Sequence, residues 1–238
     1  MKSLIAFILF FTAACSAQFR ATTNMQQSPF TTCVYPACNP GGENAPTSTV
    51  NELVTTKGLD GDLLLGVSGP EYSNALFYQK IGATTANYLV AEWNVYLPGQ
   101  TADYAQALEY DTFAFSAPYE FMWGSECVNH GYWQVWDQLH GQWINTTRTC
   151  NLAAGWHRIQ WFYHRVDGDT SCGGYPCEYY DMLNVDGDYT QLNLAYPSGP
   201  LPAGWNDNSG LQIQLDISAS GKSVKEYLGN VSLIELGK

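Results

Sequence analysis

Apolar and polar residues alternate in short runs along most of the chain. Each run is rich in aromatic and β-branched residues and is bounded by Gly, Pro, Asn or Asp, as β-strands are. No long segment shows the 3.6-residue period of an amphipathic helix. The pattern therefore predicts an all-β protein, an antiparallel β-sandwich with twelve strands. The predicted strands cover residues 62–69, 75–81, 88–97, 105–115, 119–127, 131–139, 142–150, 157–166, 178–187, 188–196, 211–219 and 226–236.

Three Asp-Gly-Asp triplets mark candidate turns, at residues 60–62, 167–169 and 186–188. Asp186-Gly187 separates two strand-like runs, and this dipeptide is typical of a type I′ hairpin turn, which needs positive φ at both central residues. A structural calcium ion is the alternative role, but no triplet has the further acidic positions of a full calcium loop. We therefore expect hairpin turns and no cofactor, with calcium as the alternative.

The N-terminus has the layout of a secretion signal. One Lys precedes an apolar run and then small residues, so we expect residues 1–17 to be a signal peptide and the protein to be secreted. The alternative is a lipid anchor on Cys15, since two small residues precede it as in bacterial lipoproteins. Residues 18–50, rich in Thr, Pro and Gly, predict a loosely held surface arm, and residues 51–238 predict a single sandwich domain.

Six cysteines remain once the signal is removed, an even number that favours disulfides in an exported chain. They fall into three local pairs along the sequence. We predict the disulfides Cys33–Cys38, Cys127–Cys150 and Cys172–Cys177.

Composition narrows the choice of ligand. The formal net charge of −12 and the pI near 4.5 oppose binding to nucleic acid or to an anionic membrane surface. After the signal no run of about 18 apolar residues follows, so we expect no membrane insertion. Only 13% of residues are charged and 14% are aromatic, a surface suited to neutral polar ligands. We expect a monomer.

Five segments carry a resemblance to a known superfamily: AEWNVYL, ALEYDTF, GWHRIQWFYHR, LNVDG and GNVSLIEL. Together they resemble the concanavalin A-like lectin/glucanase superfamily, and most of all its uncharacterised secreted bacterial members. The resemblance covers about residues 50–238 and implies a jelly-roll sandwich. Fold analogy alone implies no enzyme activity.

Glu109 and Asp111 are the candidate catalytic residues. They are two apart in a predicted strand, so they share a face, and retaining glycosidases need two carboxyl groups roughly 5 to 5.5 Å apart. In the laminarinase-like branch that the chain resembles, a third acid follows on the same strand. Phe113 and Ala114 stand at those positions here. A hydrolase would therefore take its proton from another strand, and the candidates for this role are Glu92, Glu120 and Glu126.

A polysaccharide lyase is a further alternative. It needs a Tyr or His base and a group that neutralises a uronate, and the segment HRIQWFYHR offers both types. Alternation divides these side chains between two faces, and the acidic net charge opposes a polyanionic substrate. The residues concerned are His157, Gln160, Tyr163, His164 and Arg165.

Glycan binding requires fewer specifically placed groups than catalysis does. Sugars stack their apolar faces on Trp or Tyr rings, and polar side chains bind their hydroxyl groups. The segment HGYWQVWDQLHGQW, with Trp143 at its end, is dense in both types. The candidate binding residues are Glu92, Trp93, Trp123, Trp133, Trp136, Asp137, Gln160 and His164. Trp133 and Trp136 are an odd number of residues apart, so a regular strand places one of them in the core.

The sequence therefore predicts a secreted, lectin-like protein that binds a neutral polysaccharide on the concave face of a sandwich. Two alternatives stay open. One is a glycoside hydrolase of laminarinase-like type with a displaced acid, and the other is a non-catalytic surface or adhesion module.

Overall fold

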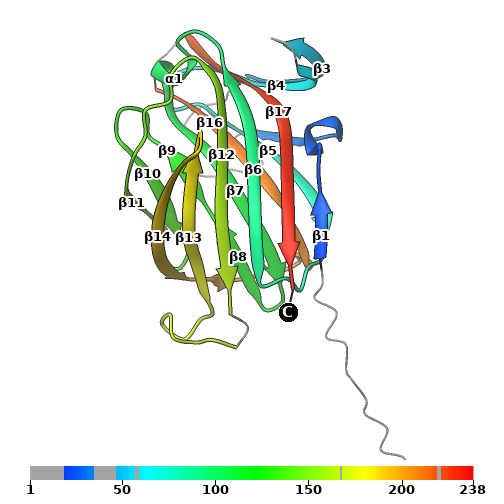
Figure 1. The fold of residues 1–238 in the computed structure, drawn as a ribbon, viewed down its shortest axis with the longest axis vertical. Helices are drawn as coiled ribbons and strands as arrows, with labels where there is room; N and C mark the ends of the chain where they lie inside the picture. Colours follow the sequence, from blue (N-terminus) through cyan, green and yellow to red (C-terminus); the bar gives the residue numbers. More distant parts are fainter. Residues whose placement is uncertain (1–18, 35–46, 57–58, 167, 219–220, 238) are drawn as a thin grey trace, which may run out of the picture.

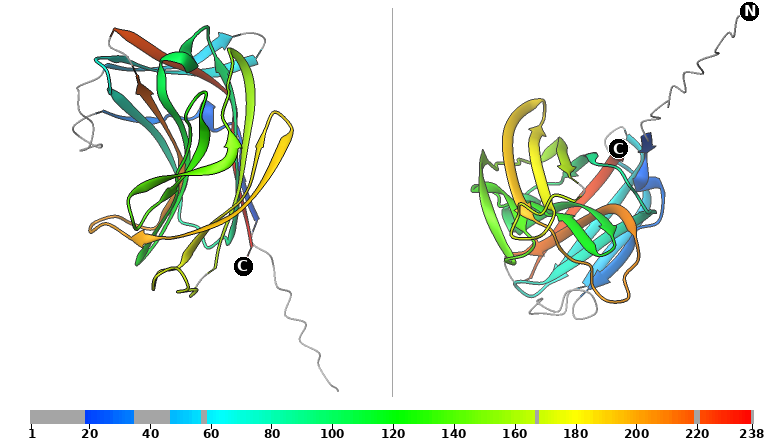
Figure 2. Two further views of the ribbon diagram at one scale, coloured as in Figure 1. Left: turned by 90° about the vertical axis from the view of Figure 1, so that its left-hand side faces the viewer. Right: turned by 90° about the horizontal axis from the view of Figure 1, so that it is seen from below.

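Two antiparallel sheets lie face to face and contain most of the chain (Figures 1 and 2). The computed structural model describes residues 19–34, 47–56, 59–166, 168–218 and 221–237. The only helices in these ranges are η1 (Met25–Gln27) and α1 (Thr101–Tyr104). The predicted all-β antiparallel sandwich is confirmed.

Sheet A has eight strands, of which seven follow one path and β1 pairs with β17. In spatial order the seven are β14 (Asp188–Pro197), β13 (Cys177–Val185), β12 (Gly155–Arg165), β6 (Tyr88–Leu97), β17 (Lys222–Leu236), β4 (Leu59–Gly69) and β3 (Thr47–Thr56), and β1 is Phe19–Thr22.

Sheet B has nine strands and carries the candidate site. Its path runs β11 (Gln142–Thr149), β10 (Tyr132–Asp137), β9 (Ser125–Cys127), β7 (Ala105–Ser116), β16 (Asn208–Ile217), β5 (Asn74–Gly82) and β2 (Thr31–Val34). Off this path, β8 (Tyr119–Trp123) pairs with β7 and with β15 (Gly199–Pro200).

Aromatic rings fill the space between the sheets. The ring of Trp161 lies 5.9 Å from Trp133 and 5.8 Å from Tyr163, and the Trp123 ring lies 5.5 Å from Tyr163. Trp93 and Trp123 are 0% exposed and Trp133 is 1% exposed. These three tryptophans, expected among the glycan-binding residues, belong to the core instead, because their rings share strand faces with apolar neighbours and keep no open face for a sugar.

Part of the segment expected as an arm is built into the sheets. Strand β1 pairs with β17 in register from Phe19↔Leu236, and the Arg20 side chain donates to Glu235. Strand β2 pairs with β5. Each has four residues, too few for alternation to be recognised in the sequence. The signal peptide and Cys15 lie outside the described residues.

Two predicted disulfides, Cys127–Cys150 and Cys172–Cys177, are confirmed, with Cα atoms 5.5 and 5.3 Å apart. The third prediction lies outside the described residues because Cys38 does. No helix in the part of the chain that the structure describes is long and apolar enough to cross a membrane.

The predicted hairpin at Asp186-Gly187 is confirmed. Val185 and Asp188 pair across it, and Asp186 and Gly187 have φ of 55° and 90°. The triplet at 60–62 is different, because Gly61 lies inside β4 with φ of 81° rather than in a turn. In the triplet at 167–169, Asp167 lies outside the described residues.

A carboxyl group is buried inside the sandwich. Glu226 of β17 is 0% exposed and accepts a hydrogen bond of 2.9 Å from the Tyr110 hydroxyl, while its other oxygen finds no partner. Burial raises the pKa of Glu226 to about 8. Ionised Glu226 therefore destabilises the fold.

Because the pKa of Glu226 is raised in the folded state, stability contributed by its protonated form is present below about pH 4.5 and is lost as the pH rises to about 8. Glu226→Gln removes this ionisation and keeps an acceptor for Tyr110. We expect the variant to gain on the order of a few kcal/mol over the wild type at pH 8 relative to pH 5. Urea denaturation at both pH values measures this difference. Asp103→Asn, at an exposed acid, is the control, and equal pH dependence of Glu226→Gln and wild type would contradict the assignment.

Candidate functional site

Alternation along β7 divides its side chains between the core and the outer face of sheet B. Leu108 and Tyr110 pack in the core, whereas Glu109 and Asp111 line a pocket on the opposite face. The expected division of this strand is therefore observed, and the two candidate acids lie together on the outer face of sheet B, where they are 7% and 3% exposed.

The pocket has a volume of about 340 Å³ and is hollowed into the outer face of sheet B. Its lining combines acids, amides and indole rings from β7, β8, β16 and the β10–β11 hairpin. The lining residues are Glu109, Asp111, Glu120, Met122, Gly124, Trp136, Gln138, Trp143, Gln212 and Gln214.

Trp136 and Trp143 form an aromatic wall. They stand directly opposite each other on β10 and β11, with ring centroids 5.1 Å apart and planes inclined at 59°. The indole N–H of Trp136 donates to the Gln138 side chain at 2.6 Å, which fixes its ring. Gly124 lets Trp136 lie close, since a Cβ at position 124 would stand 2.7 Å from the Trp136 Cβ. Both rings are partly exposed, unlike the core tryptophans.

Neutral amides, rather than cations, hold the pocket acids. Gln214 donates to Glu109 at 2.7 Å and Gln212 donates to Asp111 at 2.9 Å, each from the position opposite on β16. The backbone N–H of Ser125 also donates to Asp111, at 2.9 Å. The ion pairs found among the described residues join other groups. Neutral donors therefore hold the carboxyl groups in position, and no positively charged side chain of the described residues pairs with them.

Three further acids surround Glu109. Glu126 of β9 is its register partner, Asp111 lies two residues along β7, and Asp216 hydrogen-bonds to it. Burial raises the pKa of Glu109 well above its usual range, and the nearby charges of Asp216, Asp111 and Glu126 raise it further. A hydrogen bond between two carboxyl groups requires a proton on one of them.

The same causes act on the neighbouring acids. Burial raises the pKa of Asp111 to about 7, although hydrogen bonds from Ser125 and Gln212 lower it. Burial raises the pKa of Glu126 to about 8 and that of Asp216 to about 6. Near neutral pH the cluster therefore holds both protonated and ionised carboxyl groups, so it both donates and accepts hydrogen bonds.

Glu120 lies at the β8 side of the pocket. It accepts from Gln138 at 3.1 Å, and burial raises its pKa to about 7. Two of the three expected proton donors, Glu120 and Glu126, thus lie on the face that carries Glu109. The third, Glu92, lies on sheet A.

The other expected binding residues do not join the pocket. Glu92 and Gln160 hydrogen-bond to each other at 2.6 Å on β6 and β12 of sheet A, and Arg158 also donates to Glu92 at 2.7 Å. The His164 ring, also on β12, stacks on Tyr179 with centroids 4.1 Å apart. These strands belong to the sheet on the far side of the core.

Asp137, at the end of β10, is buried and is bound to the ring of His140, with Nδ1 to carboxylate distances of 2.8 and 2.9 Å. It supports the turn into β11 rather than lining the pocket. The residues of the lyase alternative are also dispersed. Tyr163 and Arg165 are buried and His157 pairs with Asp186, so the five residues of this alternative do not form one site.

Sequence reasoning missed Gln212, Gln214 and Asp216. They are the polar half of the alternating segment LQIQLDI, whose pattern predicts a strand but no ligand. Their place beside β7 depends on a pairing between segments about a hundred residues apart in the chain, with Gln214 bonding Glu109 at a separation of 105. Alternation alone does not give that pairing.

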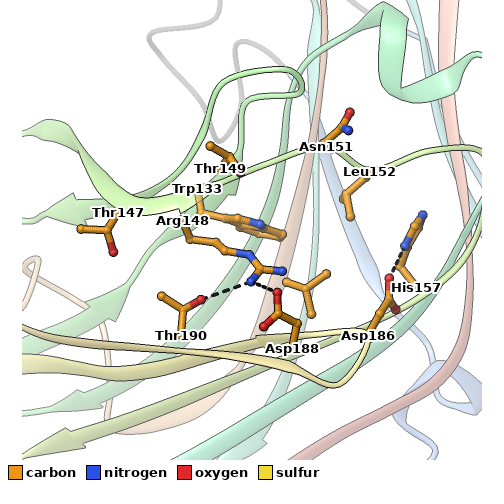
Figure 3. Close-up of a pocket in the computed structure, with 11 residues that line it drawn as sticks. Trp133, Thr147, Arg148, Thr149, Asn151, Leu152, His157, Asp186, Asp188 and Thr190 are labelled. Atoms are coloured by element: carbon orange, nitrogen blue, oxygen red, sulfur yellow. Dashed lines mark hydrogen bonds and ion pairs between the residues drawn. The ribbon is translucent and has the colours of Figure 1, made fainter.

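A second pocket, of about 600 Å³, lies between β11 and the β13–β14 hairpin (Figure 3). Its charged groups bind one another. Arg148 pairs with Asp188 and donates to Thr190 at 3.3 Å, and His157 bonds Asp186 at 2.7 Å. Figure 3 shows these bonds crossing the pocket. Because its charges are already paired and its one indole, Trp133, is buried, this pocket is the weaker candidate.

No group of three or more His, Cys, Asp or Glu side chains arranged to hold a metal ion is found in the described ranges. Calcium binding stays a prediction.

No family of known proteins matches the chain, and no curated protein matches it. Solved structures with a similar fold include the carbohydrate recognition domain of Emp47p, with 11% identity over 81% of this chain and 89% of that one and a TM-score of 0.46. The lectin UEA-II complexed with galactose matches with 11% identity over 92% and 99%, TM-score 0.46. A mutant of alginate lyase Aly36B in complex with alginate trisaccharide matches with 8% identity over 90% and 97%, TM-score 0.46. Likenesses this distant assign no residue and no ligand to this chain.

The close approach of Gly124 to Trp136 gives a test of the aromatic wall. Gly124→Ala places a methyl group against the Trp136 side chain, so Trp136 must shift away from its position beside Trp143. We expect a loss of about 1–3 kcal/mol in the free energy of unfolding and an altered near-ultraviolet circular dichroism signal from the displaced indoles. An unchanged spectrum and stability would show that the wall is loosely packed.

Proposed function

We propose that the protein is a lectin-like binder of neutral glycans and that the sheet B pocket holds the sugar. The observation that carries the proposal is the pairing of two partly exposed indole rings, Trp136 and Trp143, with carboxyl groups that amides hold in place, above all Glu109 and Asp111. A sugar ring has an apolar face that stacks on indole and a rim of hydroxyl groups that donate and accept hydrogen bonds. The pocket offers a partner for each.

Charge favours a neutral glycan. The pocket is lined by three acids, Glu109, Asp111 and Glu120, and by no Lys or Arg among the residues described. A uronate or sialate entering it would meet like charge in a partly desolvated setting, which costs more than in water. The expected secretion signal would bring the pocket to polysaccharides outside the cell.

Trp136→Ala and Trp143→Ala test this proposal. Each removes a stacking surface, and we expect each to weaken binding of neutral oligosaccharides by about tenfold, equal to about 1.4 kcal/mol. A glycan array with neutral and uronic acid-containing oligosaccharides, followed by calorimetry on the strongest binder, measures the effect. Trp156→Ala is the matched control, because Trp156 is a partly exposed indole on sheet A that packs on Tyr96. An array without signal would exclude glycan binding and leave the adhesion alternative.

Hydrolysis of the bound glycan is the second candidate, and the position of Glu126 favours it. Residues directly opposite in antiparallel strands have Cβ atoms roughly 4.5 to 5.5 Å apart, so the side chains of Glu109 and Glu126 can bring their carboxyl groups to the separation of a retaining pair. Burial and neighbouring acids raise the pKa of Glu126 to about 8, so it holds a proton at neutral pH, as a general acid must. In a laminarinase-like mechanism Glu126 would serve as the displaced acid, and Glu109 would have to be ionised to act as the nucleophile.

A reducing-sugar assay on the array's strongest polysaccharide binder separates binding from hydrolysis. If the protein is a hydrolase, Glu109→Gln and Glu126→Gln each lower turnover by at least about a hundredfold while binding persists. Glu92→Gln, on the other sheet, is the control and should leave turnover unchanged. If the wild-type protein shows no turnover, hydrolysis is excluded and glycan binding without catalysis remains.

A further inference from the structure

An exposed tryptophan lies on the same side of sheet B, beyond the pocket. Trp205 is 49% exposed and belongs to the loop that leads into β16. Its ring centroid lies 5.0 Å from that of Phe115, at the end of β7. Phe115 shares the outer face of β7 with Glu109 and Asp111, since their positions differ by even numbers.

Phe115 and Phe113 connect Trp205 to the pocket along this face. Phe115 is the register partner of Glu120, which lines the pocket, and its ring stacks on Phe113 at 4.7 Å. Phe113 lies across β16 because Gly210 has no side chain, and a Cβ there would stand 2.6 Å from the Phe113 ring. Phe113 and Phe115, which are 2% and 3% exposed, therefore form a buried link between the pocket and Trp205.

The loop holds Trp205 in place. The N–H of Trp205 donates to the Pro202 carbonyl at 3.1 Å, and the N–H of Leu201 donates to Pro118 at 2.9 Å. On the other side, the Asp207 carboxylate accepts from the N–H of Ala117 at 2.8 Å. The Lys80 ammonium lies 5.8 Å from the Trp205 ring centroid. An indole that is half exposed and yet fixed on several sides is preorganised to bind a flat apolar surface.

The length of the surface from Glu109 to Trp205 identifies the kind of ligand. Six residues of extended strand, about 20 Å, separate Glu109 from Phe115, which pairs with Glu120 at the other end of the pocket and contacts Trp205. One monosaccharide does not contact both Glu109 and Trp205, whereas a glycan chain running along β7 does. The intervening phenylalanines are buried, so the exposed contacts are the pocket and Trp205.

We infer that Trp205 is a second aromatic subsite and that the protein binds the interior of an extended neutral glycan chain rather than a terminal sugar. This inference rests on the proposed function of the pocket. It adds the length of the ligand and its direction along β7.

The test compares short and long ligands. The disaccharide and the hexasaccharide of the strongest neutral binder on the array are titrated against wild type, Trp205→Ala, Trp205→Phe and Trp136→Ala. We expect Trp205→Ala to weaken hexasaccharide binding by about tenfold and to change disaccharide binding less than twofold, with Trp205→Phe intermediate. Trp136→Ala should weaken both ligands. Tyr189→Ala, at an exposed ring on sheet A, is the control and should change neither.

The outcomes separate the two proposals. If Trp136→Ala weakens binding while Trp205→Ala affects both lengths equally or neither, the second subsite is wrong and the pocket stands. If the wild type gains no affinity from disaccharide to hexasaccharide, the extended ligand is wrong. If no glycan binds or Trp136→Ala has no effect, the proposed function itself fails. Unchanged far-ultraviolet circular dichroism confirms that each variant is folded.

Discussion

The candidate site depends on the strict alternation of β7 between a desolvated core and an outer face. A strand gives adjacent residues to opposite sides, so the Tyr110 ring that packs into the sandwich and the acids on either side of it are placed by one backbone. A register slip of one residue would bury Glu109 and Asp111 among indoles and expose Leu108 and Tyr110. The aromatic core therefore fixes the position of the polar pocket as firmly as it fixes the fold.

Desolvation links the core and the pocket. Glu226 lies between the two sheets and Glu109 lies on the outer face of sheet B, yet burial is the largest cause of the raised pKa of both carboxyl groups. Their surroundings differ. Glu226 is 0% exposed and has one hydroxyl partner, Tyr110, so its carboxyl group has a structural role at most. Glu109 adjoins other acids, a glutamine amide and a pocket of 340 Å³, so a ligand can reach its surroundings.

The positions of the strands along the chain were easier to predict from the sequence than the pairing of those strands in the sheets. Local alternation was enough to place most strands of both sheets, from β4 onward, and to put Glu109 and Asp111 on one face, but it missed β1, β2, β3 and β15. The same alternation indicates that Trp93 belongs to the core, because Trp93 shares its strand face with Ala91 and Val95.

What the sequence did not predict was strand order. Glu92, Gln160 and the pocket acids are polar positions of equal appearance in the sequence, yet β6 and β12 lie in one sheet and β7 in the other. The glutamines of β16 acquire their role only because β16 pairs with β7 across a long stretch of chain. Short strands such as β1 depend in the same way on a partner, β17, that no local pattern identifies.

The choice of amides as partners for the pocket acids argues for a ligand without charge. A guanidinium beside Asp111 would hold it ionised and would occupy more of its acceptor sites, whereas the Gln212 amide and the Ser125 N–H each donate one hydrogen bond and leave the remaining lone pairs of Asp111 available. Carboxyl groups whose pKa lies near neutral pH are partly protonated, so they can also donate hydrogen bonds. A carboxylate in an ion pair cannot. Sugar hydroxyls donate and accept in the same way, so the two hydrogen-bonding sets match without the larger desolvation cost of a charged ligand. The second pocket shows the opposite arrangement, because the Arg148–Asp188 and His157–Asp186 pairs have already used the charges that a ligand would need.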